Sequence, residues 1–330
     1  MEGLSIVILA AGKGERMVSD KPKVMHEIMG KPMISYVIER AKELLPSNIT
    51  VIVGFGKDKI LPYIKRYDID YRIQVEQKGT AHAVLCAEDI LKHNDTLILY
   101  GDVPLIESST IENFIEFYKS YNTITFMTTK VEDPSGYGRV IRDGNLIKAI
   151  IEDAEADKRQ KRIKEINTGI CIIPKRYFYL LKEIKNENRK GEYYLTDICL
   201  IANNSSINVM AYYYPKNMEV LGVNNRIELL EANVIMKERI IQWHLKKGVT
   251  LLDKNIYIED SVKIGKDTII YPNTHILGNA QIGRNVIIGP NTVIKDSFIK
   301  DNVVIKGFSH IEGLVIEKGT VVNPFTVNQK

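Results

Sequence analysis

The chain lacks the residues and runs that mark several classes of protein. Its three cysteines, Cys86, Cys171 and Cys199, lie far apart with no CxxC pair, so the sequence indicates neither a disulfide framework nor a zinc cluster. No apolar run reaches the ~18 residues of a membrane-spanning helix, and no signal segment precedes the first predicted strand. A net charge of +4 over 330 residues does not favour a nucleic acid or a membrane surface as partner. We therefore expect a cytoplasmic protein that binds neither.

What is present is an ordinary globular composition, with 45% apolar and 26% charged residues, in a chain long enough for two domains. Apolar strands alternate with helical segments over residues 1–224, which predicts an α/β domain with a largely parallel, Rossmann-like sheet. Residues 225–248 are predicted to form a linker helix that ends at a glycine, followed by a second domain over 249–330. The apolar stripe of this helix consists of Ile227, Leu230, Val234, Ile241 and Leu245.

The last part of the chain is an internal repeat with a period of six residues. Isoleucine marks each repeat at Ile258, Ile264, Ile270, Ile276, Ile282, Ile288 and Ile294, then after a slip at Ile299, Ile305 and Ile311, and after another at Ile316 and Val322. Four residues after the first seven stand Val262, Thr268, Thr274, Ala280, Val286, Thr292 and Phe298. Neither a helix nor a strand has this period, whereas a β-helix has it, because each hexapeptide forms one side of a triangular coil with isoleucine inward.

A glycine-rich loop follows the first apolar run, Leu4–Ala10. Gly12 and Gly14 break the predicted strand, and Arg16 and Lys23 bring two cations to the same loop. Backbone N–H groups in such a loop can turn inward to bind an anion, which glycine allows to approach closely. A lone pair of glycines would more simply be a strand-turn with solvated charges. The combination with both cations favours phosphate binding, without saying which phosphate.

Asp102 follows another predicted buried strand, over residues 96–100, and Asn224 stands at a further predicted strand end. Ligands of open α/β sheets bind at these ends. An aspartate there is usually a cap or turn residue, but beside a polyphosphate site it is a natural Mg²⁺ ligand, which Asn224 could join. The sequence has no nucleophile with an adjacent base and no histidine pair with metal-ligand spacing. These features favour direct displacement between bound phosphates.

Six motifs, in this order, resemble those of the bacterial N-acetylglucosamine-1-phosphate uridyltransferases. They are Leu9-Ala-Ala-Gly-Lys-Gly-Glu-Arg-Met17, Pro22-Lys-Val-Met-His26, Tyr100-Gly-Asp-Val-Pro104, Gly136-Tyr-Gly-Arg139, Glu165-Ile-Asn-Thr-Gly169 and Gly222-Val-Asn-Asn-Arg226. The first is shared by sugar-phosphate nucleotidyltransferases generally, and the later ones are typical of the uridyltransferase branch. The resemblance covers essentially the whole chain and implies a nucleotidyltransferase domain followed by a short left-handed parallel β-helix.

The resemblance also implies a set of site residues. The nucleotide would contact Leu9, Ala10, Ala11, Gly12, Gly14 and Lys23, with Gln74, Gly79 and Thr80 at the uracil. The sugar would lie among Tyr100, Gly101, Asp102, Gly138, Glu152, Asn167, Thr196 and Asn224. Arg16, Lys23 and Asp102 would be catalytic, and Asp102 and Asn224 would hold Mg²⁺. Without the resemblance, Tyr100 could be a packed strand residue, Thr196 a helix cap and Glu152 a surface carboxylate.

The implied reaction is UTP with N-acetylglucosamine 1-phosphate, giving UDP-N-acetylglucosamine, a precursor of peptidoglycan and lipopolysaccharide, and pyrophosphate. Three alternatives stay open: a nucleotidyltransferase for another base or sugar, an acyltransferase, as hexapeptide β-helices often are, and a non-catalytic assembly protein. Intact Lys23 and Asp102 argue against the last. β-Helices of this kind commonly trimerise, and we expect a homotrimer.

The sequence departs from the family in two places. Glu15 replaces the usual threonine, which puts an acid in an anion loop; it would be harmless if it points outward and would weaken nucleotide binding if it points inward. Family members are bifunctional, with an acetyl-coenzyme A-dependent acetyltransferase in a longer β-helix. This chain ends at Lys330, where those motifs would begin, and His275 and His310 lie outside the family's catalytic motif. We therefore expect no acetyltransferase activity.

Overall fold

The computed structural model describes residues 3–91 and 94–329 and divides into two compact units. The first contains the chain up to His26 together with Met33–Arg226, and the second contains Glu27–Pro32 and the chain from Ile227 onward. The short segment Glu27–Pro32 is thus grouped with the second unit, although the sequence assigns it to the domain predicted over residues 1–224.

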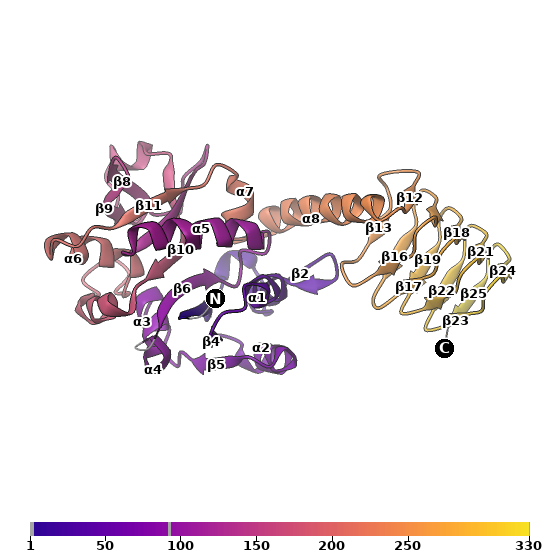
Figure 1. Ribbon diagram of the computed structural model, residues 1–330, viewed down its shortest axis with the longest axis horizontal. Helices are drawn as coiled ribbons and strands as arrows, with labels where there is room; N and C mark the ends of the chain where they lie inside the picture. The colour runs from indigo at the N-terminus through magenta and orange to yellow at the C-terminus, as the bar shows by residue number, and fades with distance from the viewer. Residues whose placement is uncertain (1–2, 92–93, 330) are drawn as a thin grey trace. The chain divides into compact units, whose positions relative to one another are not determined.

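The first unit is built on one sheet of nine strands in the order β5-β4-β1-β6-β10-β7-β11-β9-β8 (Figure 1). The strands are β1 (Leu4–Ala10), β4 (Asn48–Val53), β5 (Asp70–Ile73), β6 (Asp95–Tyr100), β7 (Thr125–Lys130), β8 (Arg139–Asp143), β9 (Leu146–Ile151), β10 (Glu165–Ile173) and β11 (Met210–Tyr213). Strands β5, β4, β1 and β6 pair in parallel, and β10 runs antiparallel between β6 and β7. The predicted α/β class and Rossmann-like sheet are confirmed.

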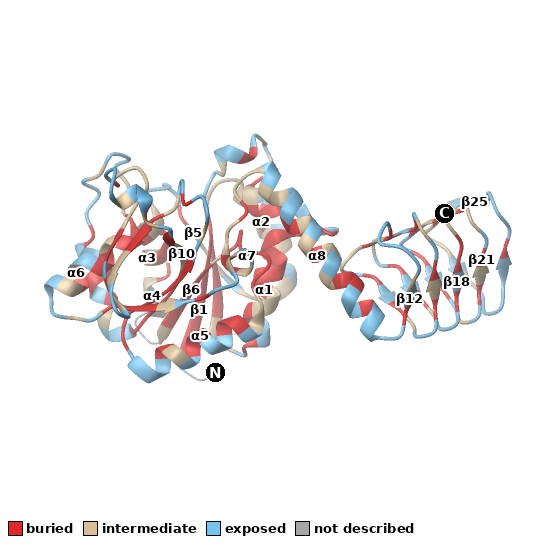
Figure 2. Cartoon of the chain, turned by 90° about the horizontal axis from the view of Figure 1, so that it is seen from above, coloured by how far each residue is buried: buried red, intermediate tan, exposed pale blue. Residues whose placement is uncertain are grey.

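Helices pack on the sheet and form an apolar core on each of its faces (Figure 2). They are α1 (Met33–Glu43), α2 (Lys57–Ile64), α3 (Thr80–Leu85), α4 (Glu88–Leu91), α5 (Ser108–Tyr121), α6 (Ile198–Asn204) and α7 (Asn217–Val220). Strand β1 shows how one strand serves both cores, because Ile6 and Ile8 enter one cluster and Val7 and Leu9 enter the other. This two-sided burial explains why β1 is an unbroken apolar run.

Several elements differ from what local sequence predicts. The helical pattern after His82 predicts one helix to about Lys92, whereas the structure has α3 and α4 divided by a turn, and Lys92 lies outside the described residues. The helix-prone segment Lys175–Lys185 forms a 3₁₀ helix over Lys175–Glu183. Asn224 does not end a strand: after α7 the chain through Leu221–Asn224 is irregular, and it is held by the Val223 N–H, which donates to the Asp102 carbonyl at 2.8 Å.

The second unit contains a hairpin, a long helix except for its first residue, and a coil of short strands. The hairpin is β2 (Glu27–Ile28) with β3 (Lys31–Pro32), and the helix is α8 (Arg226–Lys246). Of the apolar stripe predicted on α8, only Ile241 is buried; the buried residues are Ala232, Met236, Ile240, Ile241 and His244. The stripe was wrong because α8 carries apolar residues on more than one face, and periodicity does not tell which face is covered.

The coil forms three sheets of parallel strands, stacked turn on turn. Its strands are β12 (Thr250–Leu251), β13 (Tyr257–Ile258), β14 (Lys263–Ile264), β15 (Ile269–Ile270), β16 (His275–Leu277), β17 (Gln281–Ile282), β18 (Ile287–Ile288), β19 (Val293–Lys295), β20 (Phe298–Ile299), β21 (Val304–Ile305), β22 (His310–Glu312), β23 (Val315–Ile316), β24 (Val321–Val322) and β25 (Val327–Gln329). The predicted isoleucines are buried from Ile258 to Ile311, and Ile316 is half-buried. The predicted left-handed β-helix is confirmed.

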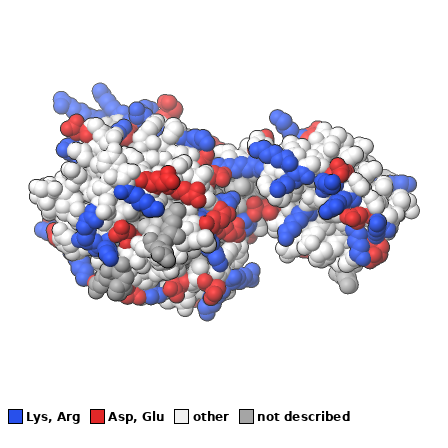
Figure 3. Space-filling view, in the orientation of Figure 1, with Lys and Arg blue, Asp and Glu red and all other residues white. Residues whose placement is uncertain are grey.

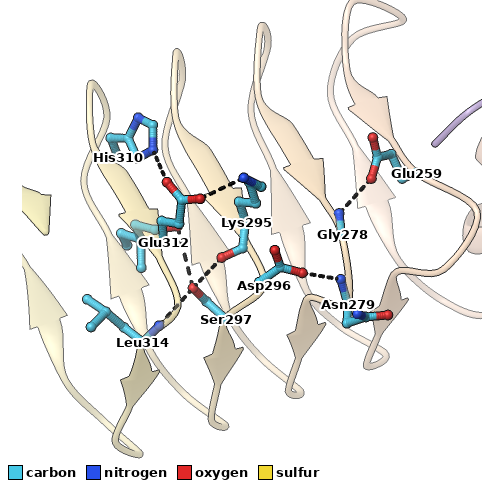
Figure 4. A network of polar contacts seen from close by, with 10 residues as sticks. Glu259, Gly278, Asn279, Lys295, Asp296, Ser297, His310, Glu312 and Leu314 are labelled. Atoms are coloured by element: carbon cyan, nitrogen blue, oxygen red, sulfur yellow. Dashed lines mark hydrogen bonds and ion pairs between the residues drawn. The ribbon is translucent and has the colours of Figure 1, made fainter. Parts of the chain in front are cut away.

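One position of the repeat was assigned wrongly. The sequence places Phe298 among the residues that stand four positions after each isoleucine and are mostly small or β-branched. In the structure Phe298 is 47% exposed, and Ser297 is buried in its place. The slip in phase therefore begins before Ile299, at the side of the coil that contains Ser297. Polar contacts join successive coils both at the surface and at the buried Ser297 (Figure 4). The Lys295 ammonium donates to Glu312 at 2.6 Å, and the Leu314 N–H donates to the Ser297 hydroxyl at 3.2 Å.

Among residues 3–91 and 94–329, no helix is long and apolar enough to cross a membrane.

Candidate active site

The loop between β1 and Lys23 begins at the carboxyl end of the central strand. Gly14 has φ of +67°, and a Cβ placed there would lie 2.6 Å from Cβ of Lys23. The Met17 N–H donates to the Gly14 carbonyl at 2.9 Å and closes a tight turn. Glycine is therefore required at this position both by the backbone conformation and by the passage of the Lys23 side chain. No atom lies within 4 Å of a Cβ built on Gly12, so the loop has open space there.

Four polar side chains from distant parts of the chain meet at this loop. The Lys23 ammonium forms an ion pair with Asp102 and donates to Asn224 Oδ1 at 3.2 Å. The Arg16 guanidinium donates to the same Asn224 oxygen at 3.0 Å. Asp102 follows β6, whose end is fixed to β1 because the Gly101 N–H donates to the Leu9 carbonyl at 2.9 Å.

This cluster suits a divalent cation. The Asp102 carboxylate and the Asn224 amide oxygen converge on one point, which the Lys23 ammonium contacts. Two protein oxygens are enough for a hard cation that takes its other ligands from phosphate and water. Among the described residues no group of three or more His, Cys, Asp and Glu could hold a metal.

A cavity of about 430 Å³ opens beside the loop. The predicted residues that line it are Leu9, Ala10, Ala11, Gly12, Lys23, Gln74, Gly79, Thr80, Tyr100 and Asp102. The structure therefore brings together nearly all of the predicted nucleotide contacts. Gly14 does not line this cavity, because the Lys23 side chain passes over it.

Gln74 is 3% exposed, and its amide is already engaged inside this cavity. Its Nε2 donates to the Gly79 carbonyl at 3.0 Å and lies 3.0 Å from His82 Nδ1. With the amide nitrogen directed at the protein, the amide oxygen remains as an acceptor. Gln74 thus also holds the Gly79 turn, a role that the sequence did not suggest.

A second cavity of about 300 Å³ adjoins the first. The predicted residues that line it are Arg16, Thr80, Tyr100, Gly138, Glu152, Asn167 and Thr196. Thr80 and Tyr100 line both cavities, so the two are contiguous. Of the predicted sugar contacts, Asp102 lines the first cavity only, and Gly101 and Asn224 line neither.

Glu152 is the main acid of the second cavity. Burial raises the pKa of its carboxyl, an effect that the hydrogen bond from Thr196 and the charge of Lys190 oppose. The Thr196 hydroxyl donates to Glu152 Oε1 at 2.9 Å. Tyr100 is a phenol whose pKa burial also raises, so it stays a neutral donor. The cavity thus presents a carboxylate, a phenol and backbone groups, the mixture expected for binding a polyhydroxylated ligand.

The sequence missed several lining residues. They are Lys13, Glu15 and Gln77 in the first cavity, Tyr137, Thr168, Lys190 and Tyr194 in the second, and Glu192 in both. Tyr137 and Thr168 stand inside motifs already recognised, which was the available signal. Lys190 and Glu192 lie in a polar segment, 186–192, whose composition gives no sign of a cavity.

Glu15 points toward solvent at the rim of the first cavity. Its side chain is 76% exposed and forms an ion pair with Lys13 at 3.1 Å. The acid in the anion loop is therefore partly offset by a neighbouring cation.

Comparisons with known proteins agree with this geometry. Residues 6–194 match the MobA-like NTP transferase domain family, and residues 261–296 match the bacterial transferase hexapeptide family. The chain is 40% identical over 330 residues to the bifunctional protein GlmU of Latilactobacillus sakei, covering 98% of this chain and 71% of that one. It is also 40% identical over 325 residues to the bifunctional protein GlmU of Thermodesulfovibrio yellowstonii, covering 98% and 72%.

Solved structures share the fold of the first part of the chain. A UDP-glucose pyrophosphorylase complexed with UDP-glucose superposes with a TM-score of 0.59 at 20% identity, covering 71% of this chain and 98% of that one. The apo form of a UDP-glucose pyrophosphorylase gives 0.59 at 18% identity, covering 72% and 98%.

Fold and site together define a nucleotidyltransferase joined to a hexapeptide-repeat β-helix. Its relatives at 40% identity match along nearly its whole length. The chain belongs to the GlmU family and is a sugar-phosphate uridylyltransferase.

Proposed function

We propose that the protein transfers UMP from UTP to N-acetylglucosamine 1-phosphate in the cytoplasm, where UTP is available, releasing pyrophosphate. The observation that carries the proposal is the junction of two cavities at Thr80 and Tyr100, next to Lys23 and Asp102. The larger cavity would hold the nucleotide and the smaller the sugar. A phosphate of each substrate would then lie near the shared wall, as a direct displacement requires.

Asp102 and Asn224 would hold Mg²⁺, which would neutralise charge on the phosphates and orient them. Lys23 lies beside both residues and has the reach to pair with phosphate oxygens. Arg16 is exposed and donates to Asn224 Oδ1 beside Lys23, where it would offset the charge that develops on the leaving pyrophosphate.

In the proposed reaction an oxygen of the sugar 1-phosphate attacks the α-phosphorus of UTP in line. The new P–O bond forms as the bond to the β-phosphate oxygen breaks, and pyrophosphate carries away that electron pair. Positioning of the two substrates and neutralisation of phosphate charge would account for the catalysis.

The deciding experiment measures pyrophosphate release from the purified full chain with a panel of nucleoside triphosphates and sugar 1-phosphates. We expect the highest kcat/KM with UTP and N-acetylglucosamine 1-phosphate in the presence of Mg²⁺. A higher value with another nucleotide or sugar would replace the substrates proposed here. Asp102→Asn should abolish turnover while the protein stays folded by circular dichroism; unchanged turnover would remove Asp102 from the site.

We also propose a homotrimer formed through the β-helix. The coils leave apolar side chains exposed, namely Ile287, Phe298, Phe308, Val315, Val321 and Phe325. By contrast, Lys, Arg, Asp and Glu are interspersed over the face of the molecule shown in Figure 3. Light scattering of the full chain should give three times the monomer mass, and a monomer would contradict the proposal. The expected lack of acetyl transfer remains a prediction, which calorimetric titration with acetyl-coenzyme A tests.

A further inference from the structure

Arg139 is a charged side chain in the core of the first unit. It begins β8, directly after Gly138, and is 1% exposed. Its Nη2 donates to Asp153 Oδ1 at 2.8 Å, and its Nη1 donates to the Tyr137 carbonyl. Among the described residues its Nε, although buried, has no hydrogen-bond partner.

This arrangement is poorly explained by stability. Burying a guanidinium costs free energy that one ion pair only partly recovers, and an unpaired buried N–H adds to the cost. An apolar side chain of similar volume would serve the core as well or better. The burial of Arg139 and its two contacts therefore indicate a role other than stabilising the fold.

The two contacts lie at the neighbouring ends of the paired strands β8 and β9, where Arg139 pairs with Ile151. Tyr137 and Gly138 at one strand end, and Glu152, which precedes Asp153, at the other, line the smaller cavity. The two strand ends approach closely, because a Cβ built on Gly138 would lie 3.4 Å from Glu152 Oε1 and 2.9 Å from Ile150 Cγ2. The Gly138 carbonyl also accepts from the Asn167 N–H at 2.8 Å. Asn167, which lines the cavity as well, is thus held directly to Gly138.

We propose that Arg139 is a positioning residue that holds Gly138 and Glu152 in place at one edge of the sugar cavity by bridging the Tyr137 carbonyl to Asp153. The inference rests on the proposed function, in which this cavity takes the sugar 1-phosphate. Arg139 does not line the cavity and acts through Gly138 and Glu152, the groups that face it. The planar guanidinium can hold both partners in fixed directions, which a lysine ammonium cannot.

A neighbouring pair provides a matched control. Arg142 lies on the same strand, and its Nε donates to Glu165 Oε2 at 2.9 Å, but neither residue lines either of the two cavities described above. Arg139→Lys, Asp153→Asn and Arg142→Lys each weaken one arginine–carboxylate pair in this part of the sheet. Thermal melting of all three measures the effect on folding separately from the effect on the substrate.

Steady-state kinetics of the full chain test the role. Arg139→Lys and Asp153→Asn should each raise the KM for N-acetylglucosamine 1-phosphate about tenfold or more, as expected when a hydrogen bond between charged groups is lost. Both should leave the KM for UTP within about twofold. The preference for N-acetylglucosamine 1-phosphate over glucose 1-phosphate should fall as well, because Gly138 and Glu152 would be held less firmly against the sugar. The double variant should be little worse than either single one.

Equal rises in both KM values, or the same sugar effect in Arg142→Lys, would overturn the inference. So would an unchanged sugar KM in Arg139→Lys and Asp153→Asn protein that is folded. Failure of the proposed function would look different: the wild-type protein itself would then not use N-acetylglucosamine 1-phosphate.

Discussion

Lys23 and Asp102 form an ion pair between the glycine-rich loop and the end of β6, with side chains 17% and 11% exposed. The same Lys23 ammonium donates to Asn224 Oδ1 at 3.2 Å. A cation of the protein thus occupies the point at which both candidate metal ligands converge. When phosphates and a divalent cation bind, Lys23 can exchange these oxygens for phosphate oxygens without a large movement of its backbone.

Lys23→Met should therefore lower kcat by about 10²–10³-fold, the usual effect of removing one charged group that stabilises a phosphoryl or acyl transition state. Pyrophosphate release at saturating substrates gives this value. The control is Lys59→Met, which removes a lysine that donates to the Asp20 carbonyl in the same loop region but lines neither cavity. If both variants lose activity equally, net charge rather than position is responsible.

Much of the fold follows from periodicity. Strand β1 is buried at every position, and each hexapeptide of the coils buries its isoleucine. Because the same pattern of burial recurs along a continuous segment, the sequence predicts both. The loop motif was predicted for a related reason, because glycines and cations close together in sequence stay close in space. Local sequence was sufficient in these cases.

The remainder depends on contacts between distant segments. Asn224 reaches Lys23 and Arg16 from an irregular segment, and no pattern in its own neighbourhood predicts that geometry. Arg139 reads in the sequence as an ordinary strand arginine, yet it is buried against Asp153. Phe298 was misplaced because a slip in a repeat can be taken up at either of two adjacent residues, and only packing decides.

Glu152 should make sugar binding depend on pH. Its raised pKa means that the carboxyl becomes protonated, as pH falls, earlier than an ordinary glutamate does. The neutral form accepts hydrogen bonds from hydroxyls less well, so the KM for the sugar 1-phosphate should rise as pH falls through the raised pKa.

Kinetics measured between pH 5 and 8 should show this rise of the KM for the sugar 1-phosphate in the wild type. The rise should be absent in Glu152→Gln, because its amide does not titrate. The substrates also titrate in this range, but they affect wild type and variant alike, so the ratio of the two KM values isolates Glu152. A ratio that does not vary with pH would show that Glu152 keeps one protonation state throughout.

Glu15→Thr should strengthen nucleotide binding modestly. The exposed Glu15–Lys13 pair contributes little to stability, so its loss should not affect folding. Removing the acid leaves the Lys13 charge available to the triphosphate, and the KM for UTP should fall by about two- to threefold. Because both groups are exposed, the advantage should shrink in high salt. An unchanged KM at low salt would indicate that Glu15 lies too far from the nucleotide to matter.

His244 should make the stability of the second unit fall in mild acid. Burial lowers the pKa of this histidine to about 4, and the side chain is 1% exposed. The ordinary pKa of histidine is about 6.5. At pH values between that pKa and the lowered one, the unfolded chain binds a proton at His244 that the folded chain does not. The contribution of His244 to stability is therefore complete above about pH 6.5 and falls by roughly 1 kcal/mol for each pH unit between about pH 6.5 and pH 4. Thermal melting of His244→Leu should show a smaller decline from pH 7 to pH 5 than the wild type, whereas His275→Gln, which changes an exposed histidine, should follow the wild type. Parallel curves for wild type and His244→Leu would mean that the buried ring is protonated without cost.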